Sequence, residues 1–179
     1  MGVDFGVVLL MHIKPIHSKF VRFIYRTYLC WKIKKSGLFD VRFYLSQLSS
    51  NASEAVSHPI RHYLDYGEAA GYLPHPLFDP SWYRDQYPDI AEGSISPLAH
   101  FLSYGALEQR QPHPLFSTST FLSSLPSDVL LERKDLNPVV RYQKFALEEN
   151  SRPHELFDPA FYLETNPDVL SAKVNPLIH

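Results

Sequence analysis

The chain has 179 residues, a length that allows one domain or a short array of repeats and excludes a large multidomain enzyme. Hydrophobic residues make up 45% of it and charged residues 20%, so enough apolar surface is present to form a core. Its 7 glycines are few beside 15 prolines, which argues against glycine-rich phosphate loops. The single cysteine, Cys30, cannot form an internal disulfide, which excludes a disulfide-stapled secreted domain.

Charge divides the chain into two parts. Residues 1–35 carry seven basic side chains and one acidic side chain, a net charge of +6. Residues 36–179 carry ten basic and eighteen acidic side chains, a net charge of −8. This difference predicts a basic N-terminal segment over residues 1–35 and an acidic body over residues 36–179.

The first fifteen residues contain an apolar run, residues 3–13, that is too short to cross a bilayer as a helix. No basic residue precedes this run and no small-residue cleavage site follows it, so a secretory signal is not predicted. We therefore expect a cytoplasmic protein, with the inner face of the membrane as the alternative location.

Residues 16–35 are predicted to form one amphipathic helix. The large apolar residues recur at steps of one, three and four, which places them on one helical face: Ile16, Phe20, Phe23, Ile24, Tyr28 and Trp31. This face either packs on the acidic body or lies on an anionic membrane surface. The residues expected to contact a membrane or a partner are Lys19, Arg22, Arg26, Trp31 and Lys32.

Three sequence blocks recur in fixed order after residue 36. The first block reads GLFDVRFYL at 37–45, PLFDPSWYR at 76–84, PLFSTSTFL at 114–122 and ELFDPAFYL at 155–163. Between the blocks lie YPDI at 87–90, LPSDVL at 125–130 and NPDV at 166–169. The last block reads HPIRHYLDYG at 58–67, SPLAHFLSYG at 96–105, NPVVRYQKFA at 137–146 and NPLIH at 175–179. Four repeats are predicted, named segments 1 to 4: residues 36–75, 76–113, 114–154 and a truncated 155–179.

Each segment is predicted to form a helical hairpin. An Asp, Ser or Asn before a Pro is a favourable N-cap followed by a favourable first helical residue, and the predicted N-caps are Asp79, Ser96, Asn137 and Asp158. Helices this short cannot bury their apolar faces alone, but stacked copies can. The predicted fold is therefore all-α, a tandem array of about 39-residue helical hairpins preceded by a basic amphipathic helix.

Several single positions follow from the repeat pattern. Trp82 and Phe101 occupy aromatic and apolar positions of segment 2 and are expected in the core. Gly67 and Gly105 are expected to end helices in the left-handed conformation. Segment 4 keeps less than one turn of its second helix, so residues 155–179 are expected to be loosely held.

Histidines and carboxylates are interpreted as structural. His100 and its counterparts lack the local spacing of zinc ligands, and segment 3 has Arg141 at the equivalent position. Asp79 and Asp158 are explained as helix caps, since Ser117 replaces them in segment 3 and a catalytic acid does not tolerate that change. We predict no metal site, no cofactor and no catalytic residue. An enzymatic activity would require that the fold bring unconnected residues together.

The pattern SGLFDxxxYL, NPDV and NPLxHYLxxGxxEGRxPHPLFDP resembles the helical repeat in the N-terminal regions of many bacterial glycosyltransferases of capsule, O-antigen and exopolysaccharide synthesis, including rhamnan-synthesis-type proteins. A similar repeat occurs in some secreted bacterial proteins. The resemblance covers residues 36–179 and is closest in segment 2, where Gly105, Glu108 and Arg110 match the Gly-x-x-Glu-Gly-Arg element. It is poorest in segment 3.

This resemblance implies a non-catalytic helical repeat module, a truncated or accessory part of a surface-polysaccharide glycosyltransferase. Its implied partner is another protein or a C-terminal glycosyltransferase domain that follows the repeats. An anionic membrane surface is a further candidate, and no nucleic acid is expected. The alternative function is a peripheral membrane or protein-interaction scaffold docked by the basic N-terminal helix.

Overall fold

A computed structural model describes residues 19–93, 95–149 and 151–179. The predictions for the apolar run 3–13 and for the first turn of the amphipathic helix at 16–18 lie outside these residues. The described part is all-α and contains no strand, only three isolated bridges, one of which joins His75 and Phe78.

Most of the helices are short. Their bounds are α2 Lys19–Ser36, α3 Val41–Ser46, α4 Ser50–Ala55, α5 Pro59–His62, α6 Pro80–Gln86, α7 Pro88–Ala91, α8 Pro97–His100, α9 Thr118–Ser124, α10 Ser127–Glu132, α11 Pro138–Glu149, α12 Pro159–Thr165 and α13 Pro167–Ser171. Two π-helical turns, η1 Tyr63–Gly67 and η2 Phe101–Gly105, directly continue α5 and α8.

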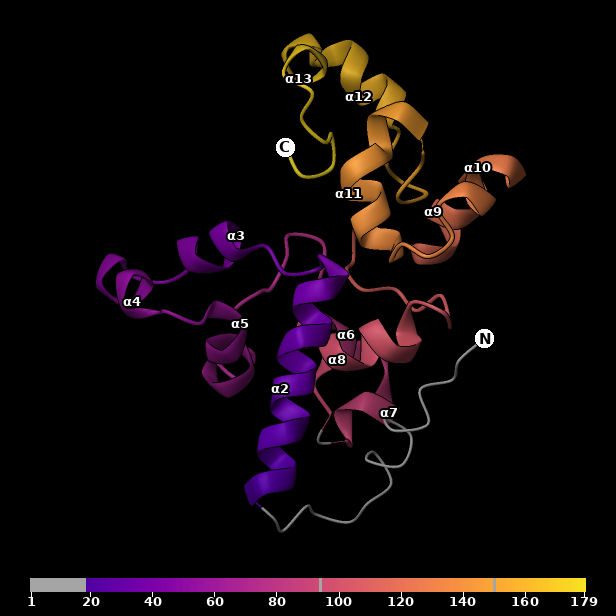
Figure 1. The fold of residues 1–179 in the computed structure, drawn as a ribbon. Helices are drawn as coiled ribbons and strands as arrows, with labels where there is room; N and C mark the ends of the chain where they lie inside the picture. The colour runs from indigo at the N-terminus through magenta and orange to yellow at the C-terminus, as the bar shows by residue number, and fades with distance from the viewer. Residues whose placement is uncertain (1–18, 94, 150) are drawn as a thin grey trace.

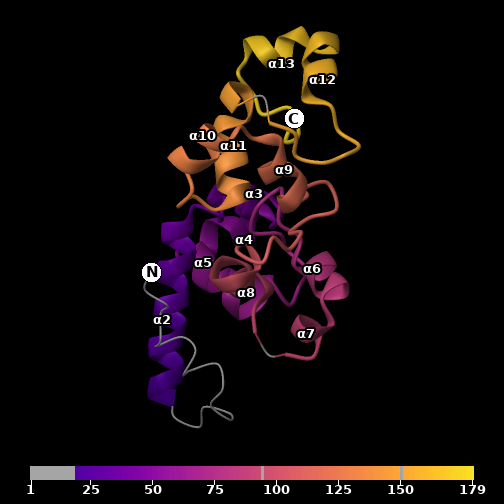
Figure 2. The same cartoon turned by 90° about the vertical axis from the view of Figure 1, so that its right-hand side faces the viewer.

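The long helix α2 lies between two groups of short helices (Figure 1). Helices α3 to α5 lie on one side of α2 and α6 to α8 on the other, and α2 contacts α5, α8 and η2. Helices α9 to α13 continue beyond the C-terminal end of α2, as the view turned by 90° also shows (Figure 2). The described structure thus places α2 against segments 1 and 2, and segments 3 and 4 further along.

The predicted N-caps are confirmed. Asp79 Oδ1 accepts hydrogen bonds from the backbone N–H groups of Ser81 and Trp82, both at 2.9 Å. Asp158 makes the same two bonds at the start of α12. Ser96 and Asn137 accept bonds from backbone N–H groups in the first turns of α8 and α11. Each of these four helices therefore begins where a short polar side chain accepts from free N–H groups of the first turn.

The prediction that Trp82 is a core residue is wrong. Tyr83, the next residue, is fully buried and packs against Phe78 and Phe101, whereas Trp82 is only half-buried. Helix α6 has only seven residues, so a one-residue difference in phase decides which ring faces the core. The prediction that Phe101 is buried is confirmed.

The left-handed conformation predicted for Gly67 and Gly105 is also wrong. Their helices do not end at these glycines but continue through the π-helical turns, and the positive φ angles occur four residues later, at Gly71 and Gln109. The glycines are required for space instead. A Cβ atom on Gly105 would overlap the hydroxyl of Tyr83, and one on Gly67 would overlap the hydroxyl of Tyr44.

The same tyrosines reach histidines of the last block. The Tyr44 hydroxyl lies 2.6 Å from Nδ1 of His62, and the Tyr83 hydroxyl lies 3.0 Å from Nδ1 of His100. In segment 4, Tyr162 and His179 form the equivalent hydrogen bond at 2.8 Å. The hydroxyl therefore joins the two helices of a segment and occupies the space that a glycine leaves open.

Segment 3 replaces all three members of this contact set together. Phe121, which has no hydroxyl, stands at the tyrosine position, Arg141 at the histidine position and Ala146 at the glycine position. The Arg141 guanidinium is buried, pairs with Glu149 at 3.0 Å and donates to the backbone carbonyls of Val129 and Leu130. Without the hydroxyl, the methyl group of Ala146 has room and no histidine is needed.

Segment 4 is less well covered than segments 2 and 3. Phe157 and Tyr162 are half-buried, whereas the equivalent Phe78 and Tyr83 are completely buried. We expect amides 160–165 to exchange with solvent faster than amides 98–104 in a dilute monomer, since local opening costs less where fewer side chains cover a helix. Hydrogen exchange followed by mass spectrometry measures this. Equal protection of the two stretches would contradict it.

Buried histidines make stability depend on pH. Burial lowers the pKa of His75, His100 and His113, so the folded protein holds them neutral while the unfolded chain binds protons below about pH 6.5. The free energy of unfolding should therefore fall as the pH drops from 7.5 to 5.5, by up to about 1.4 kcal/mol per pH unit for each histidine. Urea denaturation at several pH values measures it.

The control for this pH dependence is a pair of variants. His100→Gln should make the decline shallower, whereas His58→Gln should not, because the side chain of His58 is exposed. Burial also raises the pKa of Glu68. This shift has the opposite effect, because the free energy of unfolding falls as the pH rises through the pKa of a carboxyl that the fold keeps protonated. Stability that increases between pH 7.5 and 5.5 would contradict the assignment.

Candidate functional site

Helix α2 packs on the body with a different face from the one predicted. Leu29 and Ile33 point inward and are buried. The predicted apolar face is instead turned outward, with exposed fractions of 70% for Phe20, 59% for Phe23, 48% for Ile24 and 56% for Trp31. The interpretation that this face packs on the acidic body is therefore wrong. Apolar residues occupy both sides of α2, and only one side could be buried.

The five predicted contact residues divide into two groups. Arg26 forms an ion pair with Asp65, and Lys32 Nζ donates to Ser103 Oγ at 2.9 Å, so these two cations hold α2 against η1 and η2. Lys19, Arg22 and Trp31 are exposed. The outward face thus combines large apolar side chains with cations at both ends of the helix, including Lys34 and Lys35 near its C-terminus.

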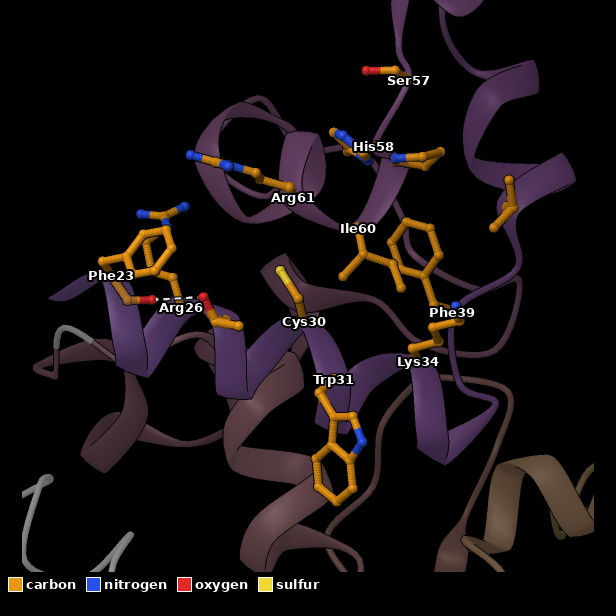
Figure 3. Close-up of a pocket in the computed structure, with 13 residues that line it drawn as sticks. Phe23, Arg26, Cys30, Trp31, Lys34, Phe39, Ser57, His58, Ile60 and Arg61 are labelled. Carbon is orange, nitrogen blue, oxygen red and sulfur yellow. Dashed lines mark hydrogen bonds between the residues drawn. The ribbon is translucent and has the colours of Figure 1, made fainter. Parts of the chain in front are cut away.

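An open groove of about 650 Å³ runs between α2 and α5 (Figure 3). Its walls are mostly apolar and include Phe23, Cys30, Trp31, Phe39 and Ile60. Cys30 and Ile60 approach each other across its middle, while Arg26 and Arg61 lie at one end and Lys34 lies on the side of Phe39.

Positive charge surrounds this groove. Its lining includes Arg26, Lys34 and Arg61 but no carboxylate among the described residues. Asp65 lies outside the lining and pairs with both Arg26 and Arg61, so two cations share one carboxylate at that end. Burial raises the pKa of the Cys30 thiol, and the positive charges of Arg26 and Arg61 oppose this shift. The groove therefore offers an apolar interior with a cationic rim.

A second groove of about 740 Å³ lies on the other side of α2. It is bounded by Trp31, Lys35, Leu102 and Leu107 and continues to Leu131 of segment 3. Asp135 lines it together with several cations, so this groove, unlike the first, has a carboxylate in its lining. Trp31 lines both grooves and links them across the outward face of α2.

The residues that match the Gly-x-x-Glu-Gly-Arg element bind one another. Arg110 donates to Glu108 at 2.6 Å and to Asp89 at 2.9 Å, and its guanidinium lies 4.7 Å from the centre of the Tyr87 ring. These contacts tie the end of segment 2 to α7. The element is thus accounted for by contacts within the segment.

One buried polar cluster was not found from the sequence. Glu68 accepts hydrogen bonds from Tyr63 and Ser96 and pairs with Arg84, which joins segment 1 to segment 2. Burial raises the pKa of Glu68, and the hydrogen bonds from Ser96 and Tyr63 oppose this shift. Segment 2 has Ala106 at the equivalent position, so the block comparison gives no signal for this glutamate.

Within the described residues, no three His, Cys, Asp or Glu side chains gather as they would around a metal ion. None of the helices in residues 19–93, 95–149 and 151–179 combines the length and the apolar character needed to cross a bilayer.

Comparisons of the chain with protein-family models, with curated proteins and with solved structures find no match.

Proposed function

We propose that the chain is a non-catalytic module of tandem helical repeats associated with bacterial surface-polysaccharide glycosyltransferases. The repeat is supported by the Tyr, His and Gly contact set, which joins the two helices of segment 1 and of segment 2 in the same way. It is further supported by segment 3, which changes all three members together. The link to glycosyltransferases is supported by the resemblance of the blocks over residues 36–179.

In this proposal the module holds a partner rather than reacting with a substrate. The partner is another protein or a glycosyltransferase domain of the same protein, and it is not a nucleic acid. The exposed Phe161 on α12 and the outward face of α2 are the surfaces offered to it.

The repeat is tested by exchanging one contact set for another. The variant Tyr83→Phe with His100→Arg and Gly105→Ala gives segment 2 the set of segment 3, and Glu108 stands where Glu149 pairs with Arg141. The triple variant should be more stable than Gly105→Ala alone, as urea denaturation would measure. A triple variant less stable than the single one would contradict equivalence of the segments.

The association with polysaccharide synthesis is tested in the source cell. Deletion of the gene should alter the amount or chain length of a surface polysaccharide, and the wild-type gene should restore it. Unchanged polysaccharide would contradict the association. Release of sugar or nucleotide from a panel of nucleotide sugars by the purified chain would contradict the non-catalytic assignment.

A second candidate function is attachment to the inner face of the membrane through α2. Phe20, Phe23, Ile24 and Trp31 are held outward by a helix that is anchored on its other side, and cations lie at both of its ends. An amphipathic helix binds an anionic surface by burying such apolar side chains while its cations meet lipid headgroups.

Vesicle co-sedimentation tests this attachment. The variant Phe20→Ser with Phe23→Ser and Trp31→Ser should bind phosphatidylglycerol vesicles about tenfold more weakly or worse, because three exposed aromatic anchors are lost. Phe161→Ser, an exposed aromatic on α12, is the matched control and should bind like the wild type. Binding should also weaken with added salt. Equal binding to phosphatidylcholine vesicles would contradict the proposal.

A further inference from the structure

The groove between α2 and α5 opens beside the outward face of α2. Phe23 and Trp31 line the groove and are also two of the exposed side chains on that face. The apolar interior of the groove is therefore continuous with the surface proposed above to meet the membrane. Apolar material in that surface has a direct path to Cys30 and Ile60 inside the groove (Figure 3).

We propose that this groove binds a single anionic lipid, with one hydrocarbon chain inside and a phosphate headgroup at its cationic end. The inference rests on the proposed attachment of α2 to the membrane and names the molecule bound there. The volume of about 650 Å³ lies within the range of small-molecule sites and suits one chain.

Charge selects the headgroup. Arg61 is mostly exposed and lies 3.6 Å from Asp65, which also pairs with Arg26, so its guanidinium retains positive charge for another anion. Lys34 lies away from this arginine, on the side of Phe39, and adds a further exposed cation to the groove lining. A phosphate at the Arg61 end would receive charge-assisted hydrogen bonds from this arginine, while an uncharged headgroup would not.

The single thiol of the chain makes the groove directly observable. Cys30 lies in the groove, so the rate at which uncharged iodoacetamide alkylates the thiol of the intact chain measures access to the groove. The probe ligand is dodecyl phosphate below its critical micelle concentration. Saturating dodecyl phosphate should slow alkylation of Cys30 at least tenfold, because its chain would cover the thiol, whereas inorganic phosphate and monomeric dodecyl maltoside should not.

Charge reversal tests the headgroup end. Arg61→Glu should raise the dodecyl phosphate concentration needed for half-protection about tenfold or more. Lys34→Glu, on the side of Phe39, should raise it less, because it changes only the potential of the groove. Arg42→Glu, an exposed residue on α3 outside the groove, makes the same charge change and should leave it unaltered. Circular dichroism shows whether a variant still contains its helices. If one of the two groove variants has lost them, the half-protection concentration of the other one tests the proposal.

Several outcomes would overturn the proposal. These are absence of protection, equal protection by dodecyl maltoside, or protection only by an acidic amphipathic peptide, which would identify a protein partner instead. If vesicles still bind while dodecyl phosphate gives no protection, the groove proposal fails and the attachment of α2 stands. If the protein binds neither vesicles nor dodecyl phosphate, the groove proposal and the proposed attachment of α2 both fail.

Discussion

Gly105→Ala is expected to destabilise the protein by about 2–3 kcal/mol, a large effect for one methyl group. The added Cβ atom would overlap the Tyr83 hydroxyl and also lie 3.0 Å from Phe101 Cδ2. Tyr83 is fully buried between Phe78 and Phe101, so its ring cannot move aside without disturbing the core. The hydrogen bond to His100 would be lost as well. Urea denaturation followed by circular dichroism measures the loss.

The double variant separates this cause from others. Tyr83→Phe removes the overlapping oxygen, so adding it to Gly105→Ala should recover part of the stability, although His100 then lacks its partner. Ala146→Gly in segment 3 is the reverse control. Phe121, at the tyrosine position of that segment, has no hydroxyl, so the change should cost only about 1 kcal/mol, the usual penalty of a glycine within a helix. A Gly105→Ala variant as stable as the wild type would refute the steric explanation.

Arg141→Met is expected to have the largest effect, a loss of about 3–5 kcal/mol. Its guanidinium is buried, pairs with Glu149 and donates to the carbonyl oxygens of Val129 and Leu130. Removing it leaves a buried carboxylate that still pairs with Arg133, and two carbonyls without this donor. Thermal or urea denaturation gives the change in the free energy of unfolding.

Two companion variants show where that loss arises. Arg141→Met combined with Glu149→Met removes both buried charges and should be more stable than Arg141→Met alone. Lys134→Met changes an exposed cation nearby and should remain within about 0.5 kcal/mol of the wild type. A loss below about 1 kcal/mol for Arg141→Met would show that solvent replaces the guanidinium without penalty.

Helix starts and the all-α class follow from sequence alone because they depend on neighbouring residues. An Asp at position 79 caps the helix that begins at Pro80, whatever the rest of the fold does. The role of Gly105 is different in kind. It depends on a hydroxyl from a residue 22 positions earlier, and a glycine after a helical pattern also indicates an ordinary helix end.

The candidate site was only partly predictable for a related reason. The sequence indicates that α2 is basic and rich in aromatic residues, but apolar side chains occupy two of its faces. Tertiary packing determines which face is buried. Helix α2 contacts α5, α8 and η2 with Leu29 and Ile33 buried, and Phe20 and Trp31 remain exposed. The groove beside α5 arises from that choice. No local pattern in residues 16–35 encodes it.

The Tyr, His and Gly contact set constrains the order in which such a segment can change during evolution. If tyrosine becomes phenylalanine first, the intermediate protein loses one hydrogen bond and keeps its packing. If glycine becomes alanine first, the intermediate must accommodate overlapping atoms. Once alanine is in place, as at position 146, the return of tyrosine at position 121 is blocked by the same overlap. In either direction, the exchange therefore avoids overlapping atoms only if it passes through an intermediate with phenylalanine and glycine.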